Sequence, residues 1–179
     1  DSTTFPTTAG AYDQTYNGSD RDIFVTKFAP AGNTLAWSTF LGGSDWDWSY
    51  GMDLDSQGNP VLTGGTRSAN FPVTSGSYDT TFALYDVFVT KLSSAGDALV
   101  WSTFLGGSLS EEGYDIVVGV RDNPIVTGLV ASSDFPVTAT GFDDSYNGTA
   151  DAFVALLSPE GEFLCWSTYL GGAGQDRGW

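Results

Sequence analysis

The sequence predicts an all-β fold, and within that class a β-propeller made of four-stranded antiparallel blades of about 64 residues. Three observations lead to this prediction. Similar blocks recur along the chain at almost constant spacing. Gly is abundant, with 23 residues, and aromatic residues make up 15% of the chain, which is typical of short strands joined by many turns. The apolar runs do not alternate with polar residues, which indicates sheets covered on both faces.

The repeat is clearest in a block that aligns without gaps in three copies. The copies read DIFVTKFAPAGNTLAWSTFLGG from Asp22, DVFVTKLSSAGDALVWSTFLGG from Asp86 and DAFVALLSPEGEFLCWSTYLGG from Asp151, at spacings of 64 and 65 residues. A second block, YGMDLDSQGNPVLTG from Tyr50, matches YDIVVGVRDNPIVTG from Tyr114. A small sheet that recurs in this way buries its apolar faces against its own copies, as propeller blades do.

Four strands are expected in each repeat. In the middle copy they fall at 52–55, 61–64, 87–92 and 99–105, with a long connection through a Phe-Pro block between the second and the third. The connections after the second and fourth strands then emerge on one face of the propeller, where all length variation among the copies falls. Loops on a rigid scaffold commonly hold binding sites, so we expect a ligand on this variable face.

The repeated elements resemble a known family. DxFVTKL followed by WSTFLGG, the GNP.VTG turn and strand, and DFPVT followed by TYNG are similar to the SBBP repeats of bacterial and archaeal β-propellers, over nearly the whole chain. This resemblance implies an exported or cell-surface module of a larger protein, without a general enzymatic activity, and it supplies no functional residues. The chain departs from the pattern at Leu156, where the other copies have Lys27 and Lys91, and at Asp53, where the next copy has Val117.

The repeats divide the chain into three parts. Residues 1–48 form a partial blade, with the third and fourth strands and the preceding Phe-Pro loop, and residues 49–112 and 113–178 form two full blades. Propellers close with about four to eight blades, so these parts do not close alone. Two explanations stay open: a segment of a larger propeller, or subunits that assemble through open blade edges.

Composition excludes several functions. Six basic and 22 acidic residues give a formal net charge of −16, which repels nucleic acid and anionic membrane surfaces. The chain contains no His, so Ser-His and Cys-His nucleophile pairs cannot form, and the single Cys165 cannot form an internal disulfide. We therefore expect no enzyme, no nucleic-acid partner and no membrane insertion.

Two sets of residues recur in every copy and are expected to be structural. Trp37, Trp101 and Trp166 occupy one strand position, where we expect packing between blades. The carboxylates that precede the third strand are expected to accept backbone N–H groups in turns. These carboxylates are Asp22, Asp86 and Asp151.

One segment on the variable face does not recur. Asp45, Trp46, Asp47 and Trp48 stand where the next copy has Ser110 and Glu112 in place of the two tryptophans. In an exposed loop the indoles would suit stacking on a sugar, with the two Asp carboxylates accepting its hydroxyl groups. Packing beneath the Phe-Pro loop and contact with another subunit or protein are the alternatives.

No cofactor is expected, and Ca²⁺ is the one ion for which the acidic loops offer ligands. The candidate ligands are Asp143, Asp144 and Asp151. The segment DLDSQGN at 53–59 resembles a calcium loop but lacks its final acidic ligand, so a hairpin turn is the better interpretation. Sequons at Asn17 and Asn147 permit N-glycosylation, and each is also an Asn-Gly turn signal.

The sequence thus favours a non-enzymatic extracellular or cell-surface propeller, which serves as a structural or adhesive module and contacts a protein or glycan surface. Two alternatives remain. One is a lectin-like propeller that binds carbohydrate through Trp46 and Trp48. The other is a self-assembling surface or filament subunit, a homo-oligomer joined through open blade edges.

Overall fold

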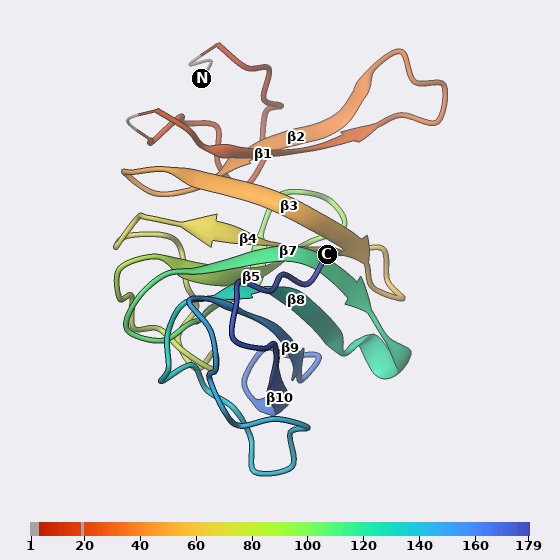
Figure 1. Cartoon of the computed structure of the whole chain (residues 1–179). Helices are drawn as coiled ribbons and strands as arrows, with labels where there is room; N and C mark the ends of the chain where they lie inside the picture. Colours follow the sequence, from red (N-terminus) through yellow and green to blue (C-terminus); the bar gives the residue numbers. More distant parts are fainter. Residues whose placement is uncertain (1–3, 19) are drawn as a thin grey trace.

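A computed structural model describes residues 4–18 and 20–179 of the chain. Within these residues ten β-strands form three antiparallel sheets, which stack on one another in chain order (Figure 1). The all-β class predicted from the sequence is therefore confirmed. The described residues do not form a closed ring of sheets.

The first sheet has two strands, and the other two sheets have four strands each, paired in chain order as β3-β4-β5-β6 and β7-β8-β9-β10. The strands are β1 (Ile23–Phe28), β2 (Leu35–Leu41), β3 (Asp47–Leu54), β4 (Pro60–Thr66), β5 (Asp86–Leu92), β6 (Leu99–Leu105), β7 (Glu111–Val118), β8 (Pro124–Val130), β9 (Asp151–Leu157) and β10 (Leu164–Leu170).

The sheets repeat each other down to their irregularities. The pairing of β1 with β2 shifts register between Lys27 and Phe28, and the pairing of β5 with β6 shifts between the equivalent Lys91 and Leu92. The β3–β4 and β7–β8 pairs likewise share a shift near the start of their first strands. Bulges at matching positions indicate that each repeat folds as one structural unit.

The sheets begin earlier than the sequence predicted. The strand expected at 52–55 starts at Asp47, and its counterpart starts at Glu111, so the second and third sheets begin two residues before the boundaries at 49 and 113. The other three strands of the middle copy match their predicted positions to within two residues. Asp47 and Trp48 therefore lie in β3 and not in a loop, which corrects the expectation for this segment.

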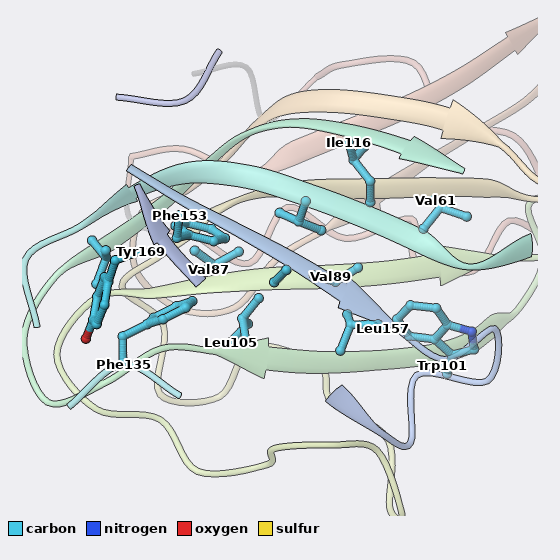
Figure 2. Close-up of a cluster of buried hydrophobic side chains, with 13 residues drawn as sticks. Val61, Val87, Val89, Trp101, Leu105, Ile116, Phe135, Phe153, Leu157 and Tyr169 are labelled. Carbon is cyan, nitrogen blue, oxygen red and sulfur yellow. The ribbon is translucent and has the colours of Figure 1, made fainter. Parts of the chain in front are cut away.

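The core lies between successive sheets. Phe88 and Trp37 belong to a cluster between the first two sheets, and Phe153 and Trp101 belong to a second cluster between the next two (Figure 2). Every residue of β4 and β5 is buried, because neighbouring sheets cover the middle sheet on both faces. This burial on both faces explains why apolar and polar residues do not alternate in these strands.

The Phe-Pro segments close the outer edge of each sheet. Phe71 stacks on Phe88 with ring centroids 4.7 Å apart, which holds the segment against its own sheet. The segment then bonds along β6: Thr74 N donates to Ser102 O at 3.0 Å, and Phe104 N donates to Asp79 O at 2.9 Å. The same bonds recur along β2 and β10. Some of the backbone groups on the outer edges thus have hydrogen-bond partners within the chain. The self-assembly alternative assumed edges whose backbone groups are free to pair with another chain.

The hairpin turns on the opposite face differ between copies. The β3–β4 turn has its left-handed residue at Gly58, with φ of 77°. In the β7–β8 turn, which contains the 3₁₀ segment Val120–Asp122, the left-handed residues are Arg121 and Asp122, with φ of 68° and 62°. None of the helical segments among the described residues is long and apolar enough to cross a membrane.

Candidate functional site

The repeated tryptophans make the contact between sheets. Trp37 Nε1 donates to Ser94 O of the next sheet at 3.0 Å, and Trp101 Nε1 donates to Pro159 O of the sheet after it at 2.9 Å. Each indole lies against the glycine of the β-turn that it reaches. A Cβ on Gly161 would lie 2.5 Å from Trp101 Cε3, so only glycine leaves room for the ring.

The third tryptophan has no such neighbour in the described residues. Trp166 lies in a hollow of about 560 Å³ that Cys165 and Phe142 also line. Leu170 beside it is 53% exposed, whereas its counterparts Leu41 and Leu105 are 1% and 0% exposed. At the other end of the stack, a Cβ on Gly32 would meet nothing within 4 Å, although its counterparts Gly96 and Gly161 are covered by indoles.

The non-repeating segment 45–48 is less open than predicted. Asp47 is only 1% exposed and accepts hydrogen bonds from Thr66 Oγ1 at 2.5 Å, Ser68 Oγ at 2.9 Å and Gly43 N at 2.7 Å. This buried carboxylate is inaccessible to sugar hydroxyls, so its assignment to an exposed surface site was wrong. Asp45 stays exposed and accepts the Trp46 N–H at 2.8 Å.

Three residues that do not recur, Arg21, Arg67 and Tyr85, gather around Trp46 and Trp48. The Arg21 and Arg67 guanidinium carbons lie 5.0 and 4.6 Å from the Trp46 ring centroid, and Arg67 also lies 4.1 Å from the Tyr85 ring. Trp48 meets Tyr85 edge-on, with centroids 5.6 Å apart. We name this group the arginine–tryptophan cluster (Arg21, Trp46, Trp48, Arg67 and Tyr85).

The cluster holds two of the chain's six basic side chains, stacked as cation–π pairs. Guanidinium groups occupy the ring environment of Trp46 that a sugar would need, and Trp48 packs on Gly65, where a Cβ would lie 2.6 Å from its ring. A cavity of about 340 Å³ adjoins the cluster, lined by Arg21, Asp22 and Asp47 among others. The geometry therefore favours a packed cationic contact surface over an open aromatic platform.

The repeated aspartates accept backbone N–H groups through one oxygen only. The Oδ2 atoms of Asp22, Asp86 and Asp151 accept from Asn17 N, Ala83 N and Asn147 N at 2.6, 2.9 and 2.9 Å. The Oδ1 atom of each is buried and has no hydrogen-bond partner in the described part of the chain. An orphaned carboxylate oxygen that recurs in three copies is a shared feature of the fold and calls for a chemical partner.

A second carboxylate, whose pairing with the first the sequence analysis did not predict, lies near the orphaned oxygen in the first two copies. It stands 25 residues after the first in every copy: Asp47, Glu111 and Asp176. Each accepts the N–H of the second glycine in the LGG turn, at 2.7 Å from Gly43, 2.9 Å from Gly107 and 2.8 Å from Gly172. The constant offset between two acids was the signal available in the sequence.

Burial raises the pKa of three of these carboxyl groups. Desolvation raises the pKa of Asp86 to about 6, and it also raises the pKa of Glu111 and of Asp47 to about 6, in spite of their hydrogen bonds. Negative charge on Asp86 contributes to the raised pKa of Glu111, and Asp22 contributes to that of Asp47. In the first two copies the negative charge of the first acid thus opposes ionisation of the second.

A buried ion pair stabilises the middle sheet near its β3–β4 hairpin turn. Lys91 Nζ lies 3.1 Å from Asp55 Oδ2 and donates to Pro159 O at 3.1 Å. Burial would raise the pKa of Asp55, but hydrogen bonds from Asn59 and Lys91 outweigh it and lower the pKa to about 2. Asp55 also accepts the N–H groups of its own turn, so the segment 53–59 forms a hairpin turn.

Two of the predicted cation ligands, Asp143 and Asp144, lie in the loop before β9. Asp143 Oδ1 accepts the Ser145 N–H at 2.8 Å, and Asp144 is exposed beside it. In residues 4–18 and 20–179 no group of three or more His, Cys, Asp or Glu side chains is arranged to hold a metal ion. The sequon amides are engaged in turns: Asn17 Nδ2 donates to Asp13 Oδ2 at 2.7 Å, and Asn147 Nδ2 donates to Ser145 O at 2.9 Å. Ser19, in the first sequon, lies outside the described residues.

Neither a protein-family model nor a curated protein matches the chain. The residues themselves must therefore indicate the function. Paired carboxylates are the catalytic groups of many glycosidases, but Asp86 and Glu111 are 1% and 0% exposed, which leaves no access for a sugar substrate. What remains accessible is the arginine–tryptophan cluster and the uncovered faces at the two ends of the stack.

Proposed function

We propose that the three sheets are successive blades of an extracellular or cell-surface β-propeller, a non-enzymatic module with a structural or adhesive role. The repeated contact of an outer-strand tryptophan with the turn of the next sheet carries this proposal. Because Trp37 and Trp101 make the same contact, each sheet is related to the next by one recurring interface, as propeller blades are.

The first strands of the sheets support the same arrangement. β3 and β7 pack against each other, and Tyr50 and Tyr114 lie on them with ring centroids 5.5 Å apart. Trp179 continues this column by stacking on Tyr114 at 4.5 Å. In a propeller the first strand of each blade lies nearest the axis, so aromatic side chains at one position of successive first strands form a column beside it.

A structural or adhesive role agrees with the chemistry of the surface. The net charge of −16 keeps the chain apart from anionic polymers, and the paired carboxylates are inaccessible. The resemblance to SBBP repeats supports the extracellular location. The arginine–tryptophan cluster is the part of the surface that does not repeat, and we assign the contact with a protein partner to it.

The uncovered face of the last sheet suits another blade. Trp166 and Leu170 occupy the positions that the next sheet covers in the two preceding copies. Since the Phe-Pro segments bond along the outer edges, a further unit is expected on this face and not on an edge. The further blade belongs to the same polypeptide or, in the self-assembly alternative, to a second copy that brings its Gly32 turn to Trp166.

The test is to add a blade. Residues 114–178 are repeated directly after Gly178, which keeps the register of the repeat. The extended chain should bury the Trp166 indole, slow the hydrogen exchange of its N–H and raise the midpoint of urea unfolding. A matched extension in which the added copy of Gly161 is replaced by Ala should lose these effects. An extended chain with unchanged Trp166 exchange and unchanged stability would contradict the proposal.

The carbohydrate alternative is tested separately. Trp46→Ala and Trp48→Ala are compared with the wild type on a glycan array. The packed cluster predicts no glycan binding that depends on these residues. Binding lost in both variants would restore the lectin-like alternative.

A further inference from the structure

One oxygen of each carboxylate pair between sheets is buried and has no hydrogen-bond partner in the described residues. Asp86, at the start of β5, and Glu111, at the start of β7, are 1% and 0% exposed and belong to successive sheets. A Cβ built on Gly106 would overlap Asp86 Oδ1 and lie 2.8 Å from Glu111 Oε2. Both oxygens therefore lie beside the position that a Gly106 Cβ would take, which brings them near each other at the LGG turn.

The same convergence occurs one repeat earlier. A Cβ on Gly42 would lie 2.7 Å from Asp22 Oδ1 and 2.9 Å from Asp47 Oδ2. The third copy is more open: Gly171 meets Asp151 Oδ1 at 2.6 Å, but Asp176 does not reach this point. Two closed pairs and one open pair thus follow the repeat.

Hydrogen bonding leaves one oxygen of each pair unpaired. Glu111 is satisfied, because Oε2 accepts from Gly107 N and Oε1 accepts from Ser132 Oγ. Asp86 Oδ2 accepts from Ala83 N, whereas Asp86 Oδ1 is buried, has no hydrogen-bond partner among the described residues and lies near Glu111 Oε2 at Gly106. Burying an uncompensated carboxylate is costly, and either a bound cation or a proton shared with Glu111 would remove that cost.

In residues 4–18 and 20–179 no basic side chain forms an ion pair with these carboxylates. The ion pairs in the described residues are Lys91–Asp55 and Arg21–Asp20, and neither involves these carboxylates. The repeat changes the length of the second acid, Asp or Glu, but never replaces it by an amide, although an amide could donate a hydrogen bond to the orphaned oxygen. What the copies keep is negative charge and oxygen ligands.

We propose that the Asp86/Glu111 pair, and its counterpart Asp22/Asp47, each bind a Ca²⁺ ion that links two successive sheets. Ca²⁺ is held by oxygen ligands, tolerates irregular coordination and completes its shell with backbone carbonyls and water. At the first pair, the cavity of about 340 Å³ lined by Asp22 and Asp47 gives the ion a route from solvent. This proposal does not depend on whether the sheets belong to a propeller.

The experiment uses the whole chain stripped of metal with a chelator. Calcium titration followed by calorimetry should give two ions per chain, and excess Ca²⁺ should raise the thermal midpoint by roughly 5 °C, with a smaller rise for Mg²⁺. Asp86→Asn should remove one ion and about half of the rise. The double variant Asp22→Asn/Asp86→Asn should remove both.

Controls separate binding from folding. In chelator at pH 7.5, Asp86→Asn should be at least as stable as the wild type, because the change removes repulsion between two carboxylates. If Asp86→Asn fails to fold, Glu111→Gln provides the same test. Asp144→Asn, at an exposed loop carboxylate, should keep both ions.

Three results would overturn the proposal. They are an absence of Ca²⁺ binding, binding that Asp86→Asn and Glu111→Gln leave unchanged, and loss of binding in Asp144→Asn. A chain whose stability responds to pH but not to Ca²⁺ would show that the pairs share a proton, which also rejects the cation.

Discussion

The contact between Trp101 and Gly161 can be tested by adding one methyl group. In Gly161→Ala the new Cβ would lie 2.5 Å from Trp101 Cε3, well inside the usual carbon contact of about 3.5 to 4.0 Å. The backbone of the substituted residue also has to adopt the φ of 68° that Gly161 has, at a net cost of about 1 kcal/mol after the change in the unfolded state is counted. Overpacking adds about 1–3 kcal/mol. Loss of the bond from Trp101 Nε1 to Pro159 O adds about 1 kcal/mol.

Gly32→Ala is the matched control. Gly32 has a φ of 71°, so the backbone cost is the same, but its Cβ would meet nothing within 4 Å. The free energy of unfolding, measured by urea denaturation with circular dichroism, should fall about 2–4 kcal/mol further in Gly161→Ala than in Gly32→Ala. In a Trp101→Ala background this difference should disappear. Equal losses in the two single variants, within about 0.5 kcal/mol, would refute the contact.

Two more predictions concern the charged groups. In chelator, Asp47, Asp86 and Glu111 carry folded-state pKa values of about 6, above their unfolded values, so their contribution to stability is complete below about pH 4 and is lost as pH rises through 6. After solvent screening each group contributes about 1–2 kcal/mol to the free energy of unfolding. Urea unfolding should therefore show higher stability at pH 4.5 than at pH 7.5. The reverse order would contradict the raised pKa values. Lys91→Leu should lower the free energy of unfolding by about 3–5 kcal/mol, because it leaves Asp55 buried without its ion-pair partner. The double variant Lys91→Leu/Asp55→Gly, which has the residues of the next repeat, should lower it much less. Equal losses in the two variants would show that the ion pair is not buried as described.

The sequence predicted the sheets well because the repeat marks each strand several times. Apolar runs on both faces predicted the burial that β4 and β5 have. The recurrence of Trp37 and Trp101 in register predicted packing between sheets before the partner turns were known. Residues that recur at equivalent positions of the repeats share the same surroundings in the fold. Their recurrence therefore predicts structural contacts.

The candidate site was predicted less well, for two physical reasons. Asp47 was grouped with its neighbouring tryptophans because those do not recur, although an acid does recur at its own position as Glu111. The partners of Trp46 come from distant positions, and no local pattern brings Arg21 and Arg67 together. The Phe-Pro segments recur in all three copies, but the hydrogen bonds that they form along the outer edges join backbone groups, which the side-chain sequence does not specify.

The most direct test of the stacked arrangement is a nuclear Overhauser spectrum of the wild-type chain with assigned indole and glycine resonances. The stacked arrangement predicts cross-peaks between the Trp37 indole and Gly96 Hα and between the Trp101 indole and Gly161 Hα, with no cross-peak between Trp166 and Gly32 in the monomer. If the Trp101 indole showed no contact with Gly161, the sheets would not pack through this interface, and the propeller proposal would fail with it.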